Sequence, residues 1–401
     1  MFGENPVTIL CLASYFKGAT FLTVCSAQGG RVLLLTREGV AHEPWPRDQL
    51  EDVFLMPDLR KRPDIIYAAS YLMRSRDIAR IVPLDDYDVE TAAALREHLR
   101  LPGIGESVAR YFRDKLAMRM QARAAGIPVP DFTPVFDYER LAEFMRRVPP
   151  PWVLKPRSEA GAMGIKKVHS AEEVWRWLER LGDEQSYFLL EQFLPGEVYH
   201  VDSIVWDGQV QFAVPHKYAQ PPMSVAHEGG VFITRTLPRT GVESEQILAL
   251  NRQLLEAFRL GHGVSHTEFI RGHDGRFYFL ETAARVGGAN IEQLVEASSG
   301  VNLWAEWAKL ELALAQGRPY VAPPDAGKFA GVLICLARQE HPNLAAYQES
   351  EIVYRLDKPY HAGVVVAAED PARVEELIAA YAPRFARDFL AVAPPLDKPP
   401  V

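Results

Sequence analysis

The 401-residue sequence lacks several features that would assign it to a class at once. Its three cysteines, Cys11, Cys25 and Cys335, form no CxxC spacing, which argues against a disulfide framework or a zinc site and favours buried free thiols in a reducing compartment. No segment reaches the roughly 18 consecutive apolar residues of a transmembrane helix, and the N-terminus lacks the basic start of a signal peptide. We therefore expect a cytoplasmic protein with no membrane contact.

Runs of basic residues are also absent, and the formal net charge of −8 argues against nucleic acid as a partner. The hydrophobic content of 48% and the charged content of 24% are ordinary for a globular protein. A chain of this length is long enough for two or three domains, each with its own core.

The first hundred residues alternate apolar strands with helical patterns, which predicts an open α/β sheet of the Rossmann-like kind. The turn after the first strand reads ASYFKGA instead of GxGxxG, so a nicotinamide dinucleotide site is not supported. The expected strands cover residues 7–13, 31–36, 52–57 and 80–85, and the expected helices cover residues 64–75 and 90–99.

From residue 105 onward, helices and strands follow one another in a mixed α+β order. Residues 216–239 fit no regular pattern, which is typical of loops that carry function. A short α+β segment is expected from about residue 326. The expected helices cover residues 105–126, 171–181, 242–259 and 289–316, and the expected strands cover residues 152–156, 165–168, 187–193 and 197–208.

The stretch HTEFIRGHDGRFYFLETAAR, residues 266–285, predicts a hairpin with one acidic residue inside each apolar strand. A two-residue turn at Asp274 and Gly275 places Glu268 opposite Glu281. Two facing carboxylates about 5 Å apart repel each other by about 3 kcal/mol at an effective dielectric near 20. A hard dication such as Mg²⁺ would relieve this repulsion. The alternatives are an exposed or protonated glutamate, or a different register.

The stretch VLKPRSEAGAMGIKKV indicates a phosphate-binding loop. Lys155 ends an apolar strand, and the small residues Gly161, Ala162, Met163 and Gly164 form a loop whose N–H groups can close over phosphates. It is not a Walker A loop, because no GK[ST] follows and the chain returns as a strand. A mobile hairpin loop with a solvated lysine is the alternative.

The stretch FLLEQFLPGE, residues 188–197, reads as a strand that leads into a Pro-Gly turn. An adenine base could form hydrogen bonds with the exposed backbone of this strand, and Glu197 could reach ribose hydroxyls. Taken alone, the same residues are explained better by an edge strand that ends in a charged turn.

These stretches occur in a definite order: DK at a helix start, KP before a glycine loop, EQFLPGE, TEF, and ETAAR followed by GG. From about residue 108 to 300 this order resembles the ATP-grasp superfamily of carboxylate–amine (or thiol) ligases, and the preceding α/β segment resembles the N-terminal domain of that superfamily. The implied domains are a Rossmann-like domain over residues 1–108, an ATP-grasp domain over 109–325, divided into subdomains of about 115–190 and 191–325, and a C-terminal α+β segment over 326–401.

The resemblance implies that ATP and magnesium bind to the motif residues. Two Mg²⁺ ions, for which Mn²⁺ can substitute, would be held by Glu268 and Glu281. Arg285 would meet a phosphate or an acyl phosphate, and together with the N–H groups of Gly287 and Gly288 it would stabilise the oxyanion. ATP itself would be bound by Lys115, Lys155, Gly161, Ala162, Met163, Gly164, Glu191, Gln192, Leu194 and Glu197.

One departure from the superfamily pattern concerns the metal ligands. The common ExNxR motif reads here as Glu281, Ala283 and Arg285, so the asparagine ligand is missing. His266, opposite position 283 in the predicted register, is a candidate to compensate, as are a bidentate carboxylate, a water molecule and Asn290. The ExxxR pattern followed by two glycines is similar to the branch that includes the bacterial L-amino-acid ligases, which make dipeptides.

The expected activity is therefore that of an ATP-dependent ligase that activates a carboxylate, such as that of an amino acid, as an acyl phosphate. An amine then attacks it, with release of ADP and phosphate. The expected acceptor pocket involves His227, Glu228 and Arg235 of segment 216–239, together with His266 and Asn290. The expected partners are small molecules and, in a homodimer, a second copy of the chain. A biotin-carboxylase-like enzyme and an inactive nucleotide sensor are the alternatives.

Overall fold

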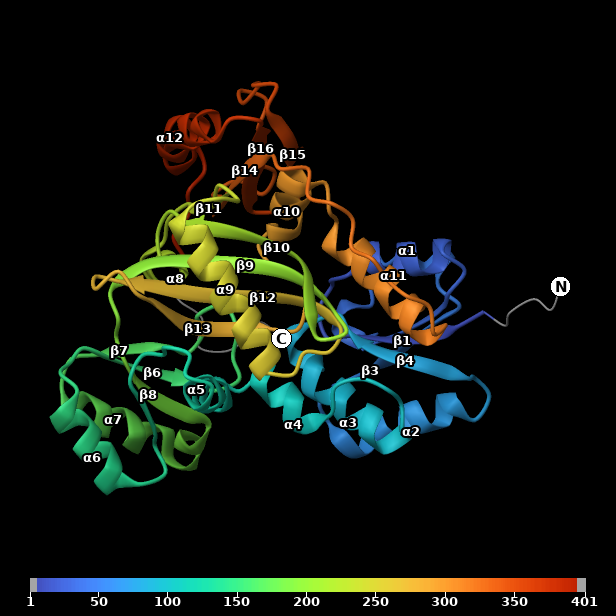
Figure 1. Ribbon diagram of the computed structural model, residues 1–401, viewed down its shortest axis with the longest axis horizontal. Helices are drawn as coiled ribbons and strands as arrows, with labels where there is room; N and C mark the ends of the chain where they lie inside the picture. Colours follow the sequence, from blue (N-terminus) through green and yellow to red (C-terminus); the bar gives the residue numbers. More distant parts are fainter. Residues whose placement is uncertain (1–5, 395–401) are drawn as a thin grey trace.

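A four-stranded parallel sheet forms the N-terminal part of the computed structural model, which describes residues 6–394 (Figure 1). Its strand order is β3-β2-β1-β4. All six residues of β1 are buried, as expected for a strand covered by helices on both faces. The strands are β1 (Thr8–Ala13), β2 (Arg31–Arg37), β3 (Asp52–Met56) and β4 (Ile78–Pro83), and the helices are α1 (Ala19–Ala27), α2 (Arg62–Met73) and α3 (Val89–Leu99). The predicted Rossmann-like arrangement is confirmed.

The single helix expected over residues 105–126 is divided into α4 (Glu106–Ala109) and α5 (Lys115–Ala124). The division has a local cause, because the Asp114 side chain accepts hydrogen bonds from the N–H groups at the start of α5 and caps a new helix there. Gly126, with φ of 73°, ends α5 in the left-handed region that favours glycine. The capped start places a lysine in the first turn of α5.

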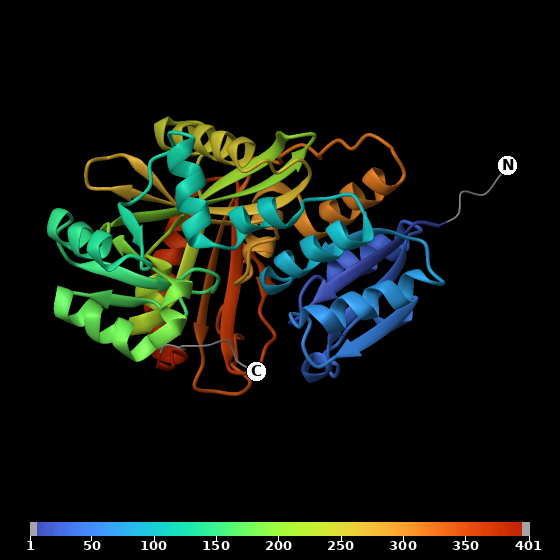
Figure 2. The ribbon, with the colours of Figure 1, turned by 90° about the horizontal axis from the view of Figure 1, so that it is seen from below.

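A second sheet, antiparallel and also four-stranded, lies at the opposite end of the molecule from the N-terminal sheet (Figure 2). Its strand order is β5-β8-β6-β7. Its elements are β5 (Phe132–Pro134), α6 (Tyr138–Arg147), β6 (Trp152–Pro156), β7 (Lys166–Val168), α7 (Ala171–Leu181) and β8 (Phe188–Gln192).

An eight-stranded antiparallel sheet occupies the middle of the molecule, with the order β13-β12-β9-β10-β11-β14-β16-β15 (Figure 1). Its strands are β9 (Gly196–Trp206), β10 (Gln209–Tyr218), β11 (Phe232–Thr236), β12 (Gly263–Gly272), β13 (Phe277–Ala283), β14 (Phe329–Leu336), β15 (Ile352–Arg355) and β16 (His361–Ala368). The helices that accompany it are α8 (Pro222–Glu228), α9 (Val242–Ala257), α10 (Ile291–Ser299), α11 (Leu303–Ala315) and α12 (Pro371–Asp388).

The segment from residue 326 onward extends this central sheet, because β14 pairs with β11. The irregular segment 216–239 contains the end of β10, then α8 and β11. The helix expected over residues 289–316 is two helices, α10 and α11, because Gly300 adopts a φ of 74° that ends the first. No helix within residues 6–394 combines the length and the apolar character needed to span a bilayer.

The central sheet has a separate core on each face. On one face Leu254 of α9 belongs to the same apolar cluster as Tyr199 of β9. On the other face the cluster that contains Phe21 of α1 also contains residues of α11, so the N-terminal sheet shares its core with the central sheet. A buried ion pair between Arg80 and Glu311, 2.7 Å apart, crosses the same contact. These contacts position the N-terminal sheet against one wall of the site.

Candidate active site

A cavity of about 830 Å³ is lined by residues of the two antiparallel sheets and of the segments that follow strands of the N-terminal sheet. This volume is within the usual range for sites that bind small molecules. Its charged lining residues come from segments far apart in the sequence: Lys17, Glu43, Asp85, Asp86, Arg113, Lys115, Lys155, Glu159, Glu191, His266, Glu268, Glu281, Arg285 and Lys358. The cavity thus collects both signs of charge in one place.

The β12–β13 hairpin places Glu268 opposite Glu281, and this prediction is confirmed. The expected two-residue turn is wrong, because the loop has three residues and Gly275 takes the left-handed position, with φ of 77°. A one-residue bulge at Leu280 then restores the predicted register. The carbonyl group of Leu280 accepts a hydrogen bond from Arg119, which helps to hold the bulge.

Both carboxylates of this pair face the cavity. The side chains of Glu268 and Glu281 are 14% and 34% exposed, so neither is splayed toward bulk solvent. Tyr218 donates a hydrogen bond to Glu268 Oε1 at 2.7 Å, and Lys115 Nζ lies 2.8 Å from Glu281 Oε2. Burial opposes ionisation of Glu281, but the charge of Lys115 outweighs it and lowers the pKa of this carboxyl. Two facing carboxylates with oxygen donors on one cavity fit a hard dication such as Mg²⁺.

Lys155, at the end of β6, belongs to a buried charge network. Its Nζ atom lies 2.6 Å from Glu191 Oε1, and Arg119 Nε lies 2.6 Å from the other oxygen of this carboxylate. Burial and the charge of Arg119 lower the pKa of Lys155 to about 8, although Glu191 opposes the shift. Glu191 was expected at the adenine edge, but its carboxylate is occupied by these two cations. Arg119 was not predicted; its position one helical turn after Lys115 was the available signal.

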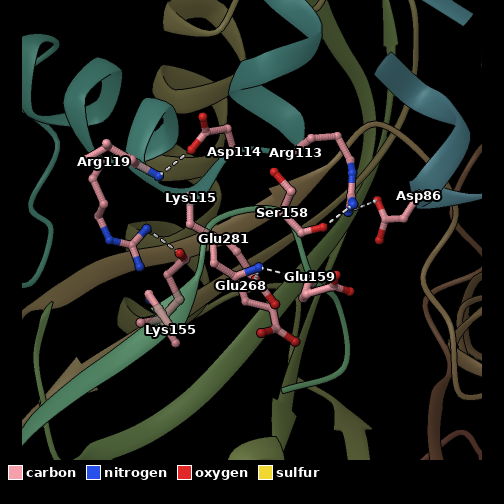
Figure 3. Close-up of polar contacts among 12 residues, drawn as sticks. Asp86, Arg113, Asp114, Lys115, Arg119, Lys155, Ser158, Glu159, Glu268 and Glu281 are labelled. Carbon is pink, nitrogen blue, oxygen red and sulfur yellow. Dashed lines mark hydrogen bonds and ion pairs between the residues drawn. The ribbon is translucent and has the colours of Figure 1, made fainter. Parts of the chain in front are cut away.

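The loop after β6 lies against α5 and the N-terminal sheet (Figure 3). Lys115 Nζ donates to the Glu159 carbonyl at 2.5 Å, and Arg113 donates to the Ser158 carbonyl. The hydroxyl of Tyr87 donates to Glu159 Oε2 at 3.0 Å. Gly161, Ala162 and Gly164 all adopt left-handed φ values, and Gly161, Ala162 and Met163 line the cavity whereas Gly164 does not.

Arg285 reaches across to the N-terminal sheet, where it pairs with Asp86. Arg113 Nη1 lies 3.8 Å from the same carboxylate. Burial opposes ionisation of Asp86, but the two arginines hold its pKa well below the usual range. Asp86 was not predicted, yet it follows β4 in the sequence LDDYD, and ligands of α/β sheets bind beyond the carboxyl ends of the strands.

Four side chains on neighbouring strands form a buried polar row beside the two glutamates. Asp202 of β9 accepts hydrogen bonds from two rings, with His266 Nδ1 at 2.9 Å and His200 Nδ1 at 2.7 Å. His200 Nε2 lies 2.8 Å from the hydroxyl of Thr234. Burial opposes a charge on His266, but Asp202 and Glu268 raise its pKa to about 9. This part of the site therefore favours a cation.

Gly287 packs directly over this row. A Cβ atom at Gly287 would lie 3.0 Å from His266 Nδ1 and 3.1 Å from Asp202 Oδ1, so a larger residue would press on the pair. Gly288 lines the cavity, and Gly287 does not. The close approach of the backbone to His266 therefore explains why residue 287 is glycine. The predicted contact of Gly287 with the oxyanion explains it less well, because Gly287 does not line the cavity.

The structure places five predicted side chains outside the cavity lining: Glu197, His227, Glu228, Arg235 and Asn290. Glu197 pairs with Lys217, 2.6 Å away, and Arg235 pairs with Glu375 of α12. Both lie on the face of the central sheet opposite the cavity, because adjacent residues of a strand point to opposite faces. The ribose role of Glu197 and the acceptor role of Arg235 are therefore not supported.

The other three of these residues lie just beside residues that do line the cavity. His227 and Glu228 end α8, whereas residues 222–226 of the same helix line the cavity. Asn290 precedes α10 and donates a hydrogen bond to Gln293 at 2.9 Å. Segment 216–239 therefore lines the cavity, as predicted, but the side chains that it contributes are mainly apolar. The predicted residues that do line the cavity are Lys115, Lys155, Gly161, Ala162, Met163, Glu191, Gln192, Leu194, His266, Glu268, Glu281, Arg285 and Gly288.

Known proteins share this architecture. The solved structure of an L-amino acid ligase from Bacillus licheniformis matches with a TM-score of 0.75 and 16% identity, covering 97% of this chain and 99% of that one. A carboxyaminoimidazole ribonucleotide synthase from Aspergillus clavatus, solved in complex with ATP, also gives 0.75, at 15% identity, with 96% and 99% covered. The chain therefore has the ATP-grasp fold that its sequence motifs predicted.

No family model matches the chain. Individual proteins, however, are similar to it in sequence. The L-arginine-specific L-amino acid ligase of Bacillus subtilis is 29% identical over 231 residues, which cover 56% of this chain and 55% of the relative. The chain thus spans about half the length of this curated relative. Over that part of its length the chain is similar to an L-amino acid ligase.

Proposed function

We propose that the protein is an ATP-dependent ligase that activates a carboxylate as an acyl phosphate and joins it to an amine, with release of ADP and phosphate. The observation that carries this proposal is the facing pair Glu268 and Glu281, which shares one cavity with Lys115, Lys155 and Arg285. Mg²⁺ held by the two glutamates would neutralise charge on the transferring phosphoryl group.

The protein's own groups account for the remaining requirements of the reaction. Lys115 and Lys155 offset the charge of the phosphates, and the N–H groups of the glycine loop close over them. The loop contacts from Tyr87 and Arg113 favour a closed state, which excludes water and so limits hydrolysis of the acyl phosphate. Arg285 supplies positive charge for the oxyanion formed when the amine attacks.

The wall formed by segment 216–239 and the N-terminal sheet supports amino acids as substrates. Phe16, Met223, Val225 and Phe232 line the cavity and offer an apolar surface to a side chain. Asp85, held 2.6 Å from Lys17, adds a carboxylate that can accept hydrogen bonds from an ammonium group. The L-amino acid ligase homologue supports the same class, and a dipeptide is the product we infer.

The decisive experiment is a phosphate-release screen of amino-acid pairs with ATP and magnesium, with products identified by mass spectrometry. We expect ADP, phosphate and a dipeptide in equal amounts. The Glu281→Gln variant should abolish release, whereas Glu197→Gln, the same change outside the cavity, should not. Bicarbonate with biotin in place of amino acids tests the carboxylase alternative. Nucleotide binding without turnover for any pair would instead identify a sensor.

A further inference from the structure

His266 is placed at the border between the buried polar row and the cavity. Its Nδ1 atom lies 2.9 Å from Asp202 Oδ1, and its Nε2 atom lies 3.5 Å from Glu268 Oε1. His266 lines the cavity, whereas His200 and Asp202 do not. One ring nitrogen is thus committed to the interior, and the other is directed toward the carboxylate that we assign to the metal.

The arrangement matches the way proteins orient a histidine that binds a metal. Such a histidine donates its second N–H to a carboxylate, which fixes the tautomer, and the ion takes the place of the proton on the other nitrogen. Here the carboxylate that accepts this hydrogen bond is that of Asp202, which is fully buried. Ala283, opposite His266 in the register, contributes a methyl group and no competing ligand.

A metal inside the buried row itself is a second arrangement to consider, since His200, Asp202 and His266 lie within ligand distance of one another. The two Asp202 oxygens are 2.7 and 2.9 Å from ring nitrogens. Two ligands of one ion, each about 2.0–2.2 Å from it, stand roughly 3 Å or more apart. The short contacts therefore identify hydrogen bonds, while the 3.5 Å gap from His266 Nε2 to Glu268 suits two ligands of one ion.

We propose that His266 is a metal ligand through Nε2, so that the ion of the nucleotide site is bound by an imidazole as well as by Glu268 and Glu281. The proposal rests on the function proposed above, because it concerns the same metal–nucleotide site. Imidazole suits transition metals, whereas Mg²⁺ prefers oxygen ligands. The site should therefore bind Mn²⁺ more tightly than a site with oxygen ligands alone.

Pulsed electron paramagnetic resonance of the full chain with MnCl2 and ADP tests the assignment without turnover. Protein labelled with ¹⁵N-histidine should show a ¹⁵N coupling to Mn²⁺, which separates the imidazole from the nitrogens of adenine. The His266→Asn variant should lose this coupling and bind Mn²⁺ about 10–100-fold more weakly, while Mg²⁺ binding changes less. His227→Asn, a histidine outside the cavity lining, is the matched control and should behave as the wild type.

A second variant tests the supporting carboxylate. Gly287→Ala adds a methyl group against the His266–Asp202 pair and should weaken the ¹⁵N coupling with all three proposed metal ligands still present. Mn²⁺ and ADP that bind without any histidine coupling would overturn the assignment and leave the proposed ligase function standing. Absence of any nucleotide binding, with either metal, would overturn the proposed function and this inference together.

Discussion

The two faces of the central sheet carry polar side chains that are three residues apart on the same strand but differ completely in setting. On the cavity face, Glu268 and His200 are paired neighbours on β12 and β9, and both are buried or nearly so. On the opposite face the same strands pair Arg271 with Glu197, whose side chain is 55% exposed. The position of a residue along its strand determines which face of the sheet its side chain occupies. This position, more than the residue type, decides which charges can take part in chemistry.

The largest effect should come from the cavity face. Glu268→Gln removes a carboxylate that we propose holds the metal but keeps an oxygen that can accept the hydrogen bond from Tyr218. Loss of several kcal/mol of phosphoryl-charge stabilisation predicts a fall in kcat on the order of 10³-fold. Steady-state phosphate release measures it. An unchanged melting temperature shows that the fold is intact, and a loss below tenfold would contradict the assignment of Glu268 to the metal.

Buried charges should also contribute to stability in a way that exposed ones do not. Glu191→Gln leaves Arg119 and Lys155 buried without their shared carboxylate, which should cost about 3–5 kcal/mol. Urea unfolding followed by tryptophan fluorescence gives the free energy. The matched change Glu197→Gln should cost below about 1 kcal/mol, because more than half of the Glu197 side chain is exposed to solvent. Equal losses for the two variants would remove the distinction between buried and exposed carboxylates.

The buried lysine predicts a pH dependence. The pKa of Lys155 is lowered to about 8, so the ammonium form that binds phosphate is present below pH 8 and is lost above it. We expect kcat/KM for ATP to fall about tenfold per pH unit above pH 8, since this parameter reports the free enzyme. Lys155→Arg, which stays charged at all accessible pH values, should remove the alkaline decline. A decline that persists in this variant would assign it to another group.

Much of the candidate site could be predicted from local sequence patterns. The residues that were correctly predicted to line the cavity lie on strands and at helix starts, which have clear local signals. Glu268 and Glu281 met as predicted even though the turn was wrong, since the bulge at Leu280 offset the three-residue loop. Such a bulge depends on what packs against it, here Arg119 from α5, and a tertiary contact of this kind has no signature within the hairpin. The acidic pair itself was readable from the sequence.

The residues that were missed or misplaced depend on contacts between distant segments. Asp86 meets Arg285 only because the N-terminal sheet docks beside β13, and no local pattern encodes that separation of 199 positions. In the sequence, Asp202 resembles any other polar residue of a strand. Its role becomes visible only when β9 and its neighbouring strands are aligned and His266 is found beside it. Glu197 was assigned by its place in a motif, without regard to which face of β9 it occupies. Alternation along β9, with Val198 lining the cavity, was the signal that could have excluded it.

The smallest effects should come from the face opposite the cavity, and they test the comparison most strictly. Glu197→Gln and Arg235→Gln each remove a charge that sequence motifs place at the site but that the fold directs toward Lys217 and Glu375. Neither side chain lines the cavity, so KM for ATP and for the amino-acid substrates should change by less than about twofold, because neither charge can contact a bound substrate. Initial rates across substrate concentrations measure both constants. A tenfold rise in KM for ATP in Glu197→Gln alone would mean that this glutamate reaches the nucleotide through a rearrangement of β9. Alternation of side chains along β9 would then be the wrong criterion for deciding which of its residues belong to the site.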